Sequence, residues 1–221
     1  FFIILSMKYC YLFLLLTGFW AEAQPLSLSR IITPGDSLRG SNTNYRNWWN
    51  VTSYALTIEP DFSARSVKGV NRMKFDIDKK SVMQLDLQEP MKIDSILGKD
   101  NEVVSFIKEG NFYFLELPPE FENRSKDNIL EIYFSGKPVI AKNAPWDGGW
   151  IFTKDKEGNP WMTVACEGIG ASIWFPCKDY LGDEPEQGAV LTIRTDKKET
   201  GVGNGKLVGV EEDEYKKSYT W

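Results

Sequence analysis

Apolar and polar side chains alternate along most of this chain from residue 48 onward, and this spacing constrains the fold more than any other feature. In the first such segment the apolar positions are Tyr54, Leu56 and Ile58, and the segment ends at Pro60. Because successive side chains of a β-strand face opposite sides of a sheet, a period of two predicts a strand with one buried face. No segment before Ala141 carries an apolar stripe at helical spacing over three turns. The predicted fold class is therefore all-β.

The same alternation recurs in short segments, separated by turn-forming residues at intervals of roughly 8–12 residues. Many short strands of this kind are typical of stacked antiparallel sheets in a sandwich rather than of alternating strands and helices. The predicted strands cover residues 54–58, 67–77, 83–87, 93–97, 103–107, 112–117, 128–134, 150–152, 161–165, 189–195, 202–210 and 215–221.

The beginning of the chain has a different composition. Residues 10–20 form a short apolar run, which Met7 and Lys8 precede and Ala21-Glu22-Ala23 follows. These features predict a secretory signal peptide that is cut after Ala23, so the protein is expected to be exported to the periplasm or the extracellular space. The alternative, an uncleaved anchor, is less favoured because the run is shorter than the ~20 residues that span a bilayer. No stable membrane span is expected after cleavage.

The domain organisation follows from this composition. Residues 1–23 are assigned to upstream sequence and the signal peptide. Residues 24–47 are rich in Ser, Thr, Asn, Gly and Pro and predict a flexible leader. Residues 48–221 form the β domain, which is expected to be truncated because the sequence stops at Trp221 in an apparent strand.

Histidine is absent from all 221 residues, and this excludes several kinds of catalytic site. A zinc site of the H-E-x-x-H type needs imidazole, and so do the Ser-His-Asp and Cys-His systems. The formal net charge is −5 with no basic stripe, which argues against a nucleic-acid partner. We therefore predict no catalytic residue, no metal ligand and no cofactor within this chain.

Glu167 is the candidate binding residue. It follows a predicted strand and precedes Gly168 and Gly170, which allow the backbone to turn sharply. A carboxylate on such a turn can bind a free α-amino group in an apolar pocket, here one formed by Trp161, Trp174 and Phe175. The alternative is a solvated surface or capping glutamate. The residue chemistry alone favours this alternative, because lone carboxylates are mostly hydrated.

Other segments leave two interpretations each. Trp146-Asp147-Gly148-Gly149 is a binding loop or, as the turn-forming residues favour, a tight turn whose Trp fills the core. Trp48 and Trp49 are predicted to line the core. The acidic residues Asp179, Asp183, Glu184 and Glu186 bind calcium or form a solvated loop, and their order favours the loop. The pair Cys166 and Cys177 forms a disulfide or, as two cysteines in so large a domain favour, stays as free thiols.

Several motifs, taken in order, resemble the N-terminal domain of zinc aminopeptidases, the gluzincins related to aminopeptidase N and leukotriene hydrolase. The version here is similar to exported members of Bacteroidetes type, and the resemblance runs from about Trp49 to the end of the chain. The motifs are Asp86-Leu87-Gln88, Ser135-Gly136-Lys137-Pro138, Pro145-Trp146-Asp147-Gly148-Gly149, Cys166-Glu167-Gly168, Trp174-Phe175-Pro176-Cys177-Lys178-Asp179 and Gly203-Asn204-Gly205-Lys206-Leu207.

The resemblance implies a saddle-shaped stack of antiparallel sheets that leans against a thermolysin-like catalytic domain. It also implies a role for Glu167, since Cys166-Glu167 matches the family position whose Gln or Glu binds the free N-terminus of a peptide substrate. The loop expected to line the substrate pocket then contains Gly168, Ile169, Gly170 and Ala171. The catalytic zinc and its ligands belong to the catalytic domain of the same polypeptide, so this chain alone is expected to be inactive.

The alternative function is a stand-alone secreted β-sandwich that binds glycans or proteins through its Trp-rich loops. A catalytically dead relative used as a scaffold is a third, weaker possibility. Sequence beyond codon 221 separates the first two. An H-E-x-x-H motif in frame favours the enzyme, and a stop codon favours the binding module.

Overall fold

The computed structural model describes residues 33–144 and 146–221. The predicted signal peptide and the first part of the predicted leader lie outside these residues. The compact unit runs from Gly35 to Trp221. Within the two described ranges, no helix is both long and apolar enough to cross a membrane.

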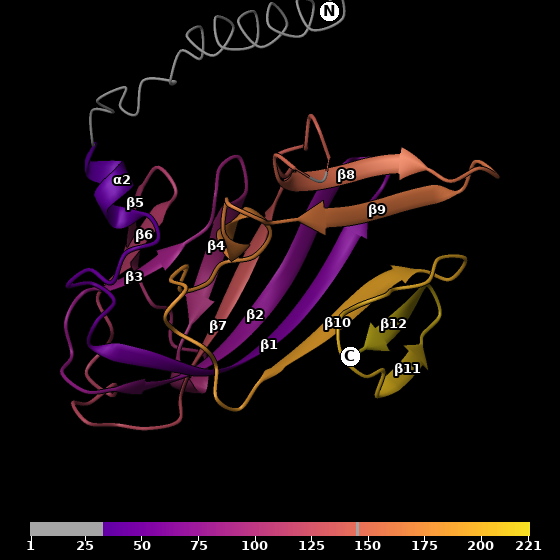
Figure 1. Ribbon diagram of the computed structural model, residues 1–221. Coiled ribbons are helices and arrows are strands. Elements are labelled where there is room, and N and C mark those ends of the chain that lie inside the picture. Colours follow the sequence, from indigo (N-terminus) through magenta and orange to yellow (C-terminus); the bar gives the residue numbers. More distant parts are fainter. Residues whose placement is uncertain (1–32, 145) are drawn as a thin grey trace, which may run out of the picture. The chain divides into compact units, whose positions relative to one another are not determined.

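A seven-stranded sheet forms the largest layer, in the order β11-β12-β10-β1-β2-β7-β4 (Figure 1). Its longest strands, β1 and β2, are joined by a tight turn, and β2 also pairs with β7. Its strands are β1 (Trp49–Asp61), β2 (Ser66–Ile77), β4 (Lys92–Leu97), β7 (Asn128–Gly136), β10 (Ala189–Asp196), β11 (Gly209–Glu212) and β12 (Lys216–Thr220).

Two smaller sheets complete the β structure. One is three-stranded and the other is a two-stranded hairpin that leads into residues 166–171 (Figure 1). Helical elements are short: α2 (Pro34–Leu38), η2 (Lys99–Asn101) and η3 (Ala171–Ile173). The strands of the two sheets are β3 (Met83–Asp86), β5 (Phe106–Glu109) and β6 (Phe112–Leu115), then β8 (Gly149–Lys154) and β9 (Pro160–Ala165).

The all-β fold class is confirmed, but one pairing is not antiparallel. β1 and β10 run parallel, with Tyr54 opposite Ala189 and Ile58 opposite Ile193. Parallel neighbours need a long crossover connection, which the chain between the two strands supplies. Alternating side chains have the same period in both kinds of pairing, so the sequence pattern could not distinguish them.

Two predicted strands are wrong in position. The segment predicted at 103–107 contributes Val103 only as an isolated bridge to Leu97, and the strand itself begins at Phe106. The segment predicted at 202–210 is strand only from Gly209 onward. Before that, the chain passes close over its neighbours: the Trp221 indole Nε1 donates a hydrogen bond to the Gly201 carbonyl at 3.2 Å. This side-chain contact holds an irregular segment, in which the backbone does not form the hydrogen bonds of a strand.

Side chains from the large sheet and the three-stranded sheet form one hydrophobic core. Phe75 of β2 is fully buried, stacks on Phe121 at 5.9 Å between centroids, and meets Trp49 edge-on at 5.9 Å. Trp48 and Trp49 are buried, as predicted. Core residues of the two sheets include Met73, Phe75, Leu130 and Ile132 from the large sheet, and Met83, Leu85, Tyr113 and Leu115 from the small one.

Truncation of Phe75 tests this core. The Phe75→Ala variant removes a ring from the contact between Trp49 and Phe121, and should lower the free energy of unfolding by about 3–5 kcal/mol. Ile107 is 68% exposed, so Ile107→Ala should change it by no more than about 0.5 kcal/mol. Urea unfolding of both variants measures the difference, and similar costs for the two would contradict the assigned core.

Candidate functional site

The loop of residues 166–171, here called the glutamate loop, leads from β9 to η3. Its backbone closes a tight turn in which the Cys166 carbonyl accepts hydrogen bonds from the amides of Ile169 at 3.4 Å and Gly170 at 3.2 Å. Gly168 has φ 72° and Gly170 has φ 86°, a region in which a side chain is strained. The sharp turn predicted from the two glycines is present.

Gln88 binds the second half of the glutamate loop and the residue that follows it. Its side-chain Nε2 donates to the Ile169 carbonyl at 2.5 Å and to Ser172 Oγ at 3.1 Å. Its backbone amide donates to the Ser172 carbonyl at 2.9 Å. Arg39 adds a bond from Nη2 to the same Ile169 carbonyl at 3.2 Å. The loop backbone is therefore tied to the segment that follows β3.

Asp179 holds the end of the loop from the other side. Its carboxylate accepts hydrogen bonds from the amides of Ala171 and Ser172, each at 3.3 Å, and from Ser172 Oγ at 2.5 Å. A Cβ on Gly170 would lie 2.1 Å from Asp179 Oδ2, so only glycine fits beneath this carboxylate. The predicted solvated acidic loop is therefore wrong at Asp179.

Glu167 lies in this turn with an exposed side chain. In the described part of the chain its carboxylate has neither a hydrogen bond nor an ion pair. Ile169 is half-buried and packs against Gly148, where an added Cβ would lie 2.2 Å from Ile169 Cδ1. The turn thus presents a free negative charge on a backbone that is fastened at several points.

The predicted apolar pocket around Glu167 is not formed by these residues alone. Trp161 is 56% exposed, and Trp174 packs edge-on against the buried Phe175 at 4.6 Å between centroids. Of the predicted binding residues, Glu167 and Gly168 are exposed, whereas the others are half-buried: Ile169, Gly170 and Ala171. The structure brings all five together in one turn and leaves their outer side open.

A buried ion pair is connected to the glutamate loop through Asp179. Arg46 Nη2 contacts Asp86 Oδ2, and both side chains are almost fully buried. Arg46 Nη1 also donates to the carbonyls of Leu38 and Ser41, each at 2.7 Å. The Asp179 amide donates to Asp86 Oδ2 at 3.2 Å. The pair therefore joins the segment before β1, strand β3 and the segment that carries the loop.

The ionisation of Asp86 reflects this position. Burial raises the pKa of Asp86 above its ordinary value, while Arg46 and the hydrogen bonds from Gln84 and the Asp179 amide oppose the rise. Gln84 is itself fully buried and donates to Asp86 Oδ1 at 2.8 Å. Sequence reasoning missed this network, because Arg46 lies within the predicted flexible leader and its partner is 40 residues away.

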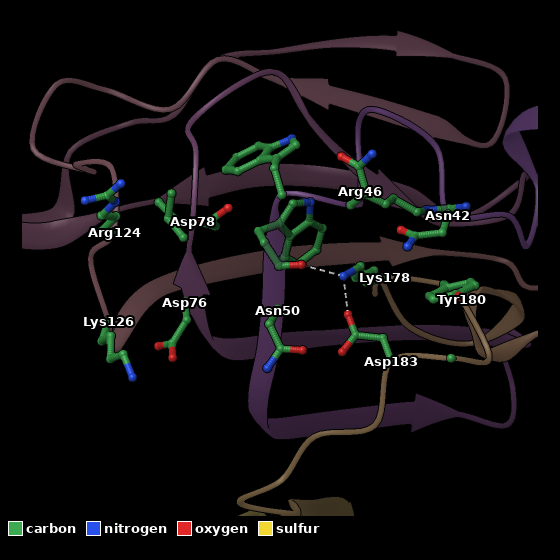
Figure 2. Close-up of a pocket in the computed structure, with 15 residues that line it drawn as sticks. Asn42, Arg46, Asn50, Asp76, Asp78, Arg124, Lys126, Lys178, Tyr180 and Asp183 are labelled. Carbon is green, nitrogen blue, oxygen red and sulfur yellow. Dashed lines mark hydrogen bonds and ion pairs between the residues drawn. The ribbon is translucent and has the colours of Figure 1, made fainter.

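A polar cavity of about 460 Å³ lies beside the start of β1, and Asn50 is one of the residues that line it (Figure 2). One wall is the buried ion pair between Lys178 and Asp183. Lys178 Nζ donates to the Trp49 carbonyl at 2.6 Å and lies 4.6 Å from the centre of the Trp49 ring. Burial lowers the pKa of Lys178, and Asp183 opposes this. Glu167 does not line this cavity.

The remaining candidates behave differently from one another. Cys166 is exposed and Cys177 is buried, both are free thiols, and burial raises the pKa of each. Trp146 is 81% exposed, so the prediction that it fills the core is wrong. The predicted turn there is present, since Asp147 Oδ2 accepts hydrogen bonds at 2.7 Å from the amides of Lys142 and Asn143.

Among the acidic residues after Asp179, Asp183 departs from the predicted solvated loop, whereas Glu184 and Glu186 are exposed. Asp183 is buried against Lys178, while Glu186 accepts a hydrogen bond from Asn50 Nδ2 at 2.9 Å. Residues 33–144 and 146–221 contain no group of three or more Cys, Asp or Glu side chains that could hold a metal ion. With no histidine in the sequence, the residues present do not fit a catalytic zinc site.

Comparison with known proteins supports a fold and not an individual identity. No protein-family model and no curated protein sequence matches the chain. Similar solved structures include an M1 zinc metallopeptidase from Deinococcus radiodurans bound to a Tyr-Ser-Ala substrate, with TM-score 0.64 and 16% identity over 80% of this chain and 39% of that chain. Native yeast LTA4 hydrolase matches with TM-score 0.62 and 16% identity over 89% of this chain and 30% of that chain.

The described β structure therefore has the fold of the N-terminal domain of M1 zinc metallopeptidases. The chain spans 39% of the length of the Deinococcus protein and 30% of that of the yeast protein. At this level of sequence identity the likeness concerns the fold alone.

The buried ion pair can be tested by removing one partner. The Asp86→Ala variant leaves the Arg46 guanidinium buried without its counter-charge, and should lower the free energy of unfolding by about 3–5 kcal/mol. The exposed pair of Lys92 and Asp94, 3.0 Å apart, is the matched control. Asp94→Ala should cost less than about 1 kcal/mol. Chemical unfolding measures both, and a small loss in Asp86→Ala would show that the buried pair does not stabilise the fold.

The fit beneath Asp179 can be tested with two glycine variants. Gly170→Ala strains a backbone with positive φ and also places a methyl group against the carboxylate of Asp179. Gly110→Ala, at φ 59° with open space around it, should cost only the strain of about 1–2 kcal/mol. We expect Gly170→Ala to cost more in unfolding free energy and to speed amide exchange at Ser172. Equal effects would argue against the close fit.

Proposed function

We propose that this chain is the N-terminal β domain of an exported zinc aminopeptidase, in which Glu167 binds the free α-amino group of the peptide substrate. The supporting observation is the exposed Glu167 carboxylate, which has no partner among the described residues and lies on a turn fixed by Gln88 and Asp179. The fold of the N-terminal domain of M1 zinc metallopeptidases adds support. The argument for export is the signal peptide predicted from the sequence.

The physical basis of the proposed role is preorganisation. A carboxylate binds an ammonium group through charge-assisted hydrogen bonds, which are stronger than neutral ones. The glutamate loop is already held by the bonds from Gln88 to Ile169 and from Ser172 to Asp179, so little ordering entropy is lost on binding. Glu167 has no ion pair with any residue in ranges 33–144 and 146–221, so none has to break there before the substrate binds.

The open side of the glutamate loop defines the proposed partner. Glu167 and Gly168 are exposed, and Trp161 does not close over them. We propose that a catalytic domain of the same polypeptide forms the opposite wall of the pocket and carries the zinc and the general base. This chain then contributes to substrate binding and orientation, and its own residues perform no bond-breaking step.

A second candidate is a secreted module that binds glycans or proteins. The exposed rings of Trp146 and Trp161, at 81% and 56%, favour it because exposed aromatic side chains often mark binding surfaces. Aminopeptidase activity in the full-length protein separates the two candidates.

Substitution of Glu167 in the full-length protein tests the proposed role. Loss of a hydrogen bond to a cation costs about 1.5–3 kcal/mol, so Glu167→Ala should lower kcat/KM for aminoacyl substrates about 10- to 150-fold, mainly through KM. Glu167→Gln keeps the shape and an oxygen that accepts a hydrogen bond but loses the charge, so it should give a smaller loss than Glu167→Ala. The exposed Glu157, in the turn between β8 and β9, provides the control variant Glu157→Ala, which should leave the kinetics unchanged.

Two results would contradict the proposal at different levels. Unchanged aminopeptidase kinetics in both Glu167 variants would remove the assigned role of Glu167 and leave the enzyme class intact. An inactive full-length protein that holds no zinc would exclude the enzyme class.

A further inference from the structure

The polar cavity beside the start of β1 is a second place where a ligand fits, and no part of the proposed aminopeptidase role uses it. Its volume of about 460 Å³ lies within the range of about 300–1,000 Å³ that is typical of small-molecule sites. Figure 2 shows side chains converging on it from the segment before β1, from the end of β2, from residues 124–126 and from residues 178–183. Glu167 and Gln88 lie outside it.

The charges around the cavity balance. Among the lining cations, Arg46 is paired with Asp86, and Lys178 is paired with Asp183. The charges that remain are two cations and two carboxylates: Arg124, Lys126, Asp76 and Asp78. None of these four forms an ion pair with another residue in the described ranges. The cavity therefore has no net charge to attract an ion of either sign.

This balance excludes the simplest ionic ligands. A phosphate or sulfate ion would lie beside the carboxylates of Asp76, Asp78 and Asp183, which would repel it. A divalent cation would meet Arg124 and Lys126, and residues 33–144 and 146–221 contain no cluster of three metal-ligating side chains. A purely apolar ligand also fits poorly, because most of the lining side chains are polar or charged, and Trp48 and Trp49 are buried.

The available groups suit a neutral ligand with many hydroxyl groups. The amides of Asn42, Asn47 and Asn50 supply donors and acceptors side by side, while Asp78 accepts and Arg124 donates. Neighbouring hydroxyls of a sugar donate and accept in the same manner, so each planar group can contact two of them. The ring of Tyr180 is half-buried and provides one amphipathic face.

Part of the lining is held in place before any ligand binds. Asn50 donates to Glu186 at 2.9 Å, and Asp76 Oδ1 accepts from the Asp127 amide at 3.0 Å. Lys178 contacts both the Asp183 carboxylate and the Trp49 carbonyl, as the dashed lines in Figure 2 show. Neither oxygen of the buried Asp183 carboxylate has a hydrogen bond in the described structure beyond the ion pair with Lys178.

We propose that this cavity is a binding site for a mono- or disaccharide, separate from the glutamate loop. The proposal is independent of the aminopeptidase assignment, because neither Glu167 nor a catalytic domain takes part. Asp78 is the residue that the site depends on most, since its exposed carboxylate has no partner in the described structure and faces the cavity.

Nuclear magnetic resonance titration of the isotope-labelled protein tests the site. Glucose, galactose, mannose, N-acetylglucosamine and a disaccharide of each are added one at a time, with glycine and sodium sulfate as charged probes. We expect at least one sugar to shift the amide signals of Asn50 and Lys126 in a saturable manner. Asp78→Ala should weaken this binding about tenfold or more, because it removes a charged hydrogen-bond acceptor.

Controls separate binding from folding. Asp78→Asn keeps the shape of the side chain and should weaken binding less than Asp78→Ala does. Asp94→Asn, on β4 and outside the cavity, should bind like the unmodified protein. The proposal is overturned if no sugar shifts these signals, if Asp78→Ala binds unchanged, or if only glycine or sulfate binds.

Discussion

The buried ion pair between Arg46 and Asp86 is the interaction on which the position of the glutamate loop depends. It lies where the segment before β1, strand β3 and the segment after β9 meet, and each supplies a hydrogen bond to it. A buried charge without a counter-charge is strongly destabilising, so these three segments have to stay together once the pair has formed. Asp179, which is tied to Asp86, in turn fixes the glutamate loop through Ala171 and Ser172.

This arrangement separates the parts of the domain that give rigidity from the part that is free to bind. Gln88 and Asp179 each form several hydrogen bonds within the fold, whereas the Glu167 carboxylate forms none among the described residues. A charge that has no internal partner but whose backbone is fixed can bind an external cation at a small cost in entropy. The polar cavity lined by Lys178 and Asp183 follows the same principle, because it combines hydrogen-bonded side chains with side chains that have no partner in the described residues.

Much of the fold could be predicted from local pattern, because a strand with one buried face has an obligatory period of two. The alternation in residues 54–58 and 67–77 identified the two central strands, and Trp48 and Trp49 were recognised as core residues. Pairing partners could not be predicted in the same manner, as the parallel contact between Tyr54 and Ala189 shows. The prediction that Trp146 fills the core was wrong, because a turn motif specifies the backbone and not whether its aromatic ring packs into the core.

By itself, the sequence determined that this chain is β-rich, that it holds no imidazole for metal or proton chemistry, and that the backbone turns sharply at Gly168 and Gly170. Each of these depends on neighbouring residues or on composition alone. Only the tertiary structure decided which charges are buried and paired and which stay free. Arg46 and Glu167 are both charged residues in predicted irregular segments, yet Arg46 is buried against a carboxylate 40 positions away and Glu167 is exposed. That difference arises from contacts between distant segments, which no local pattern encodes.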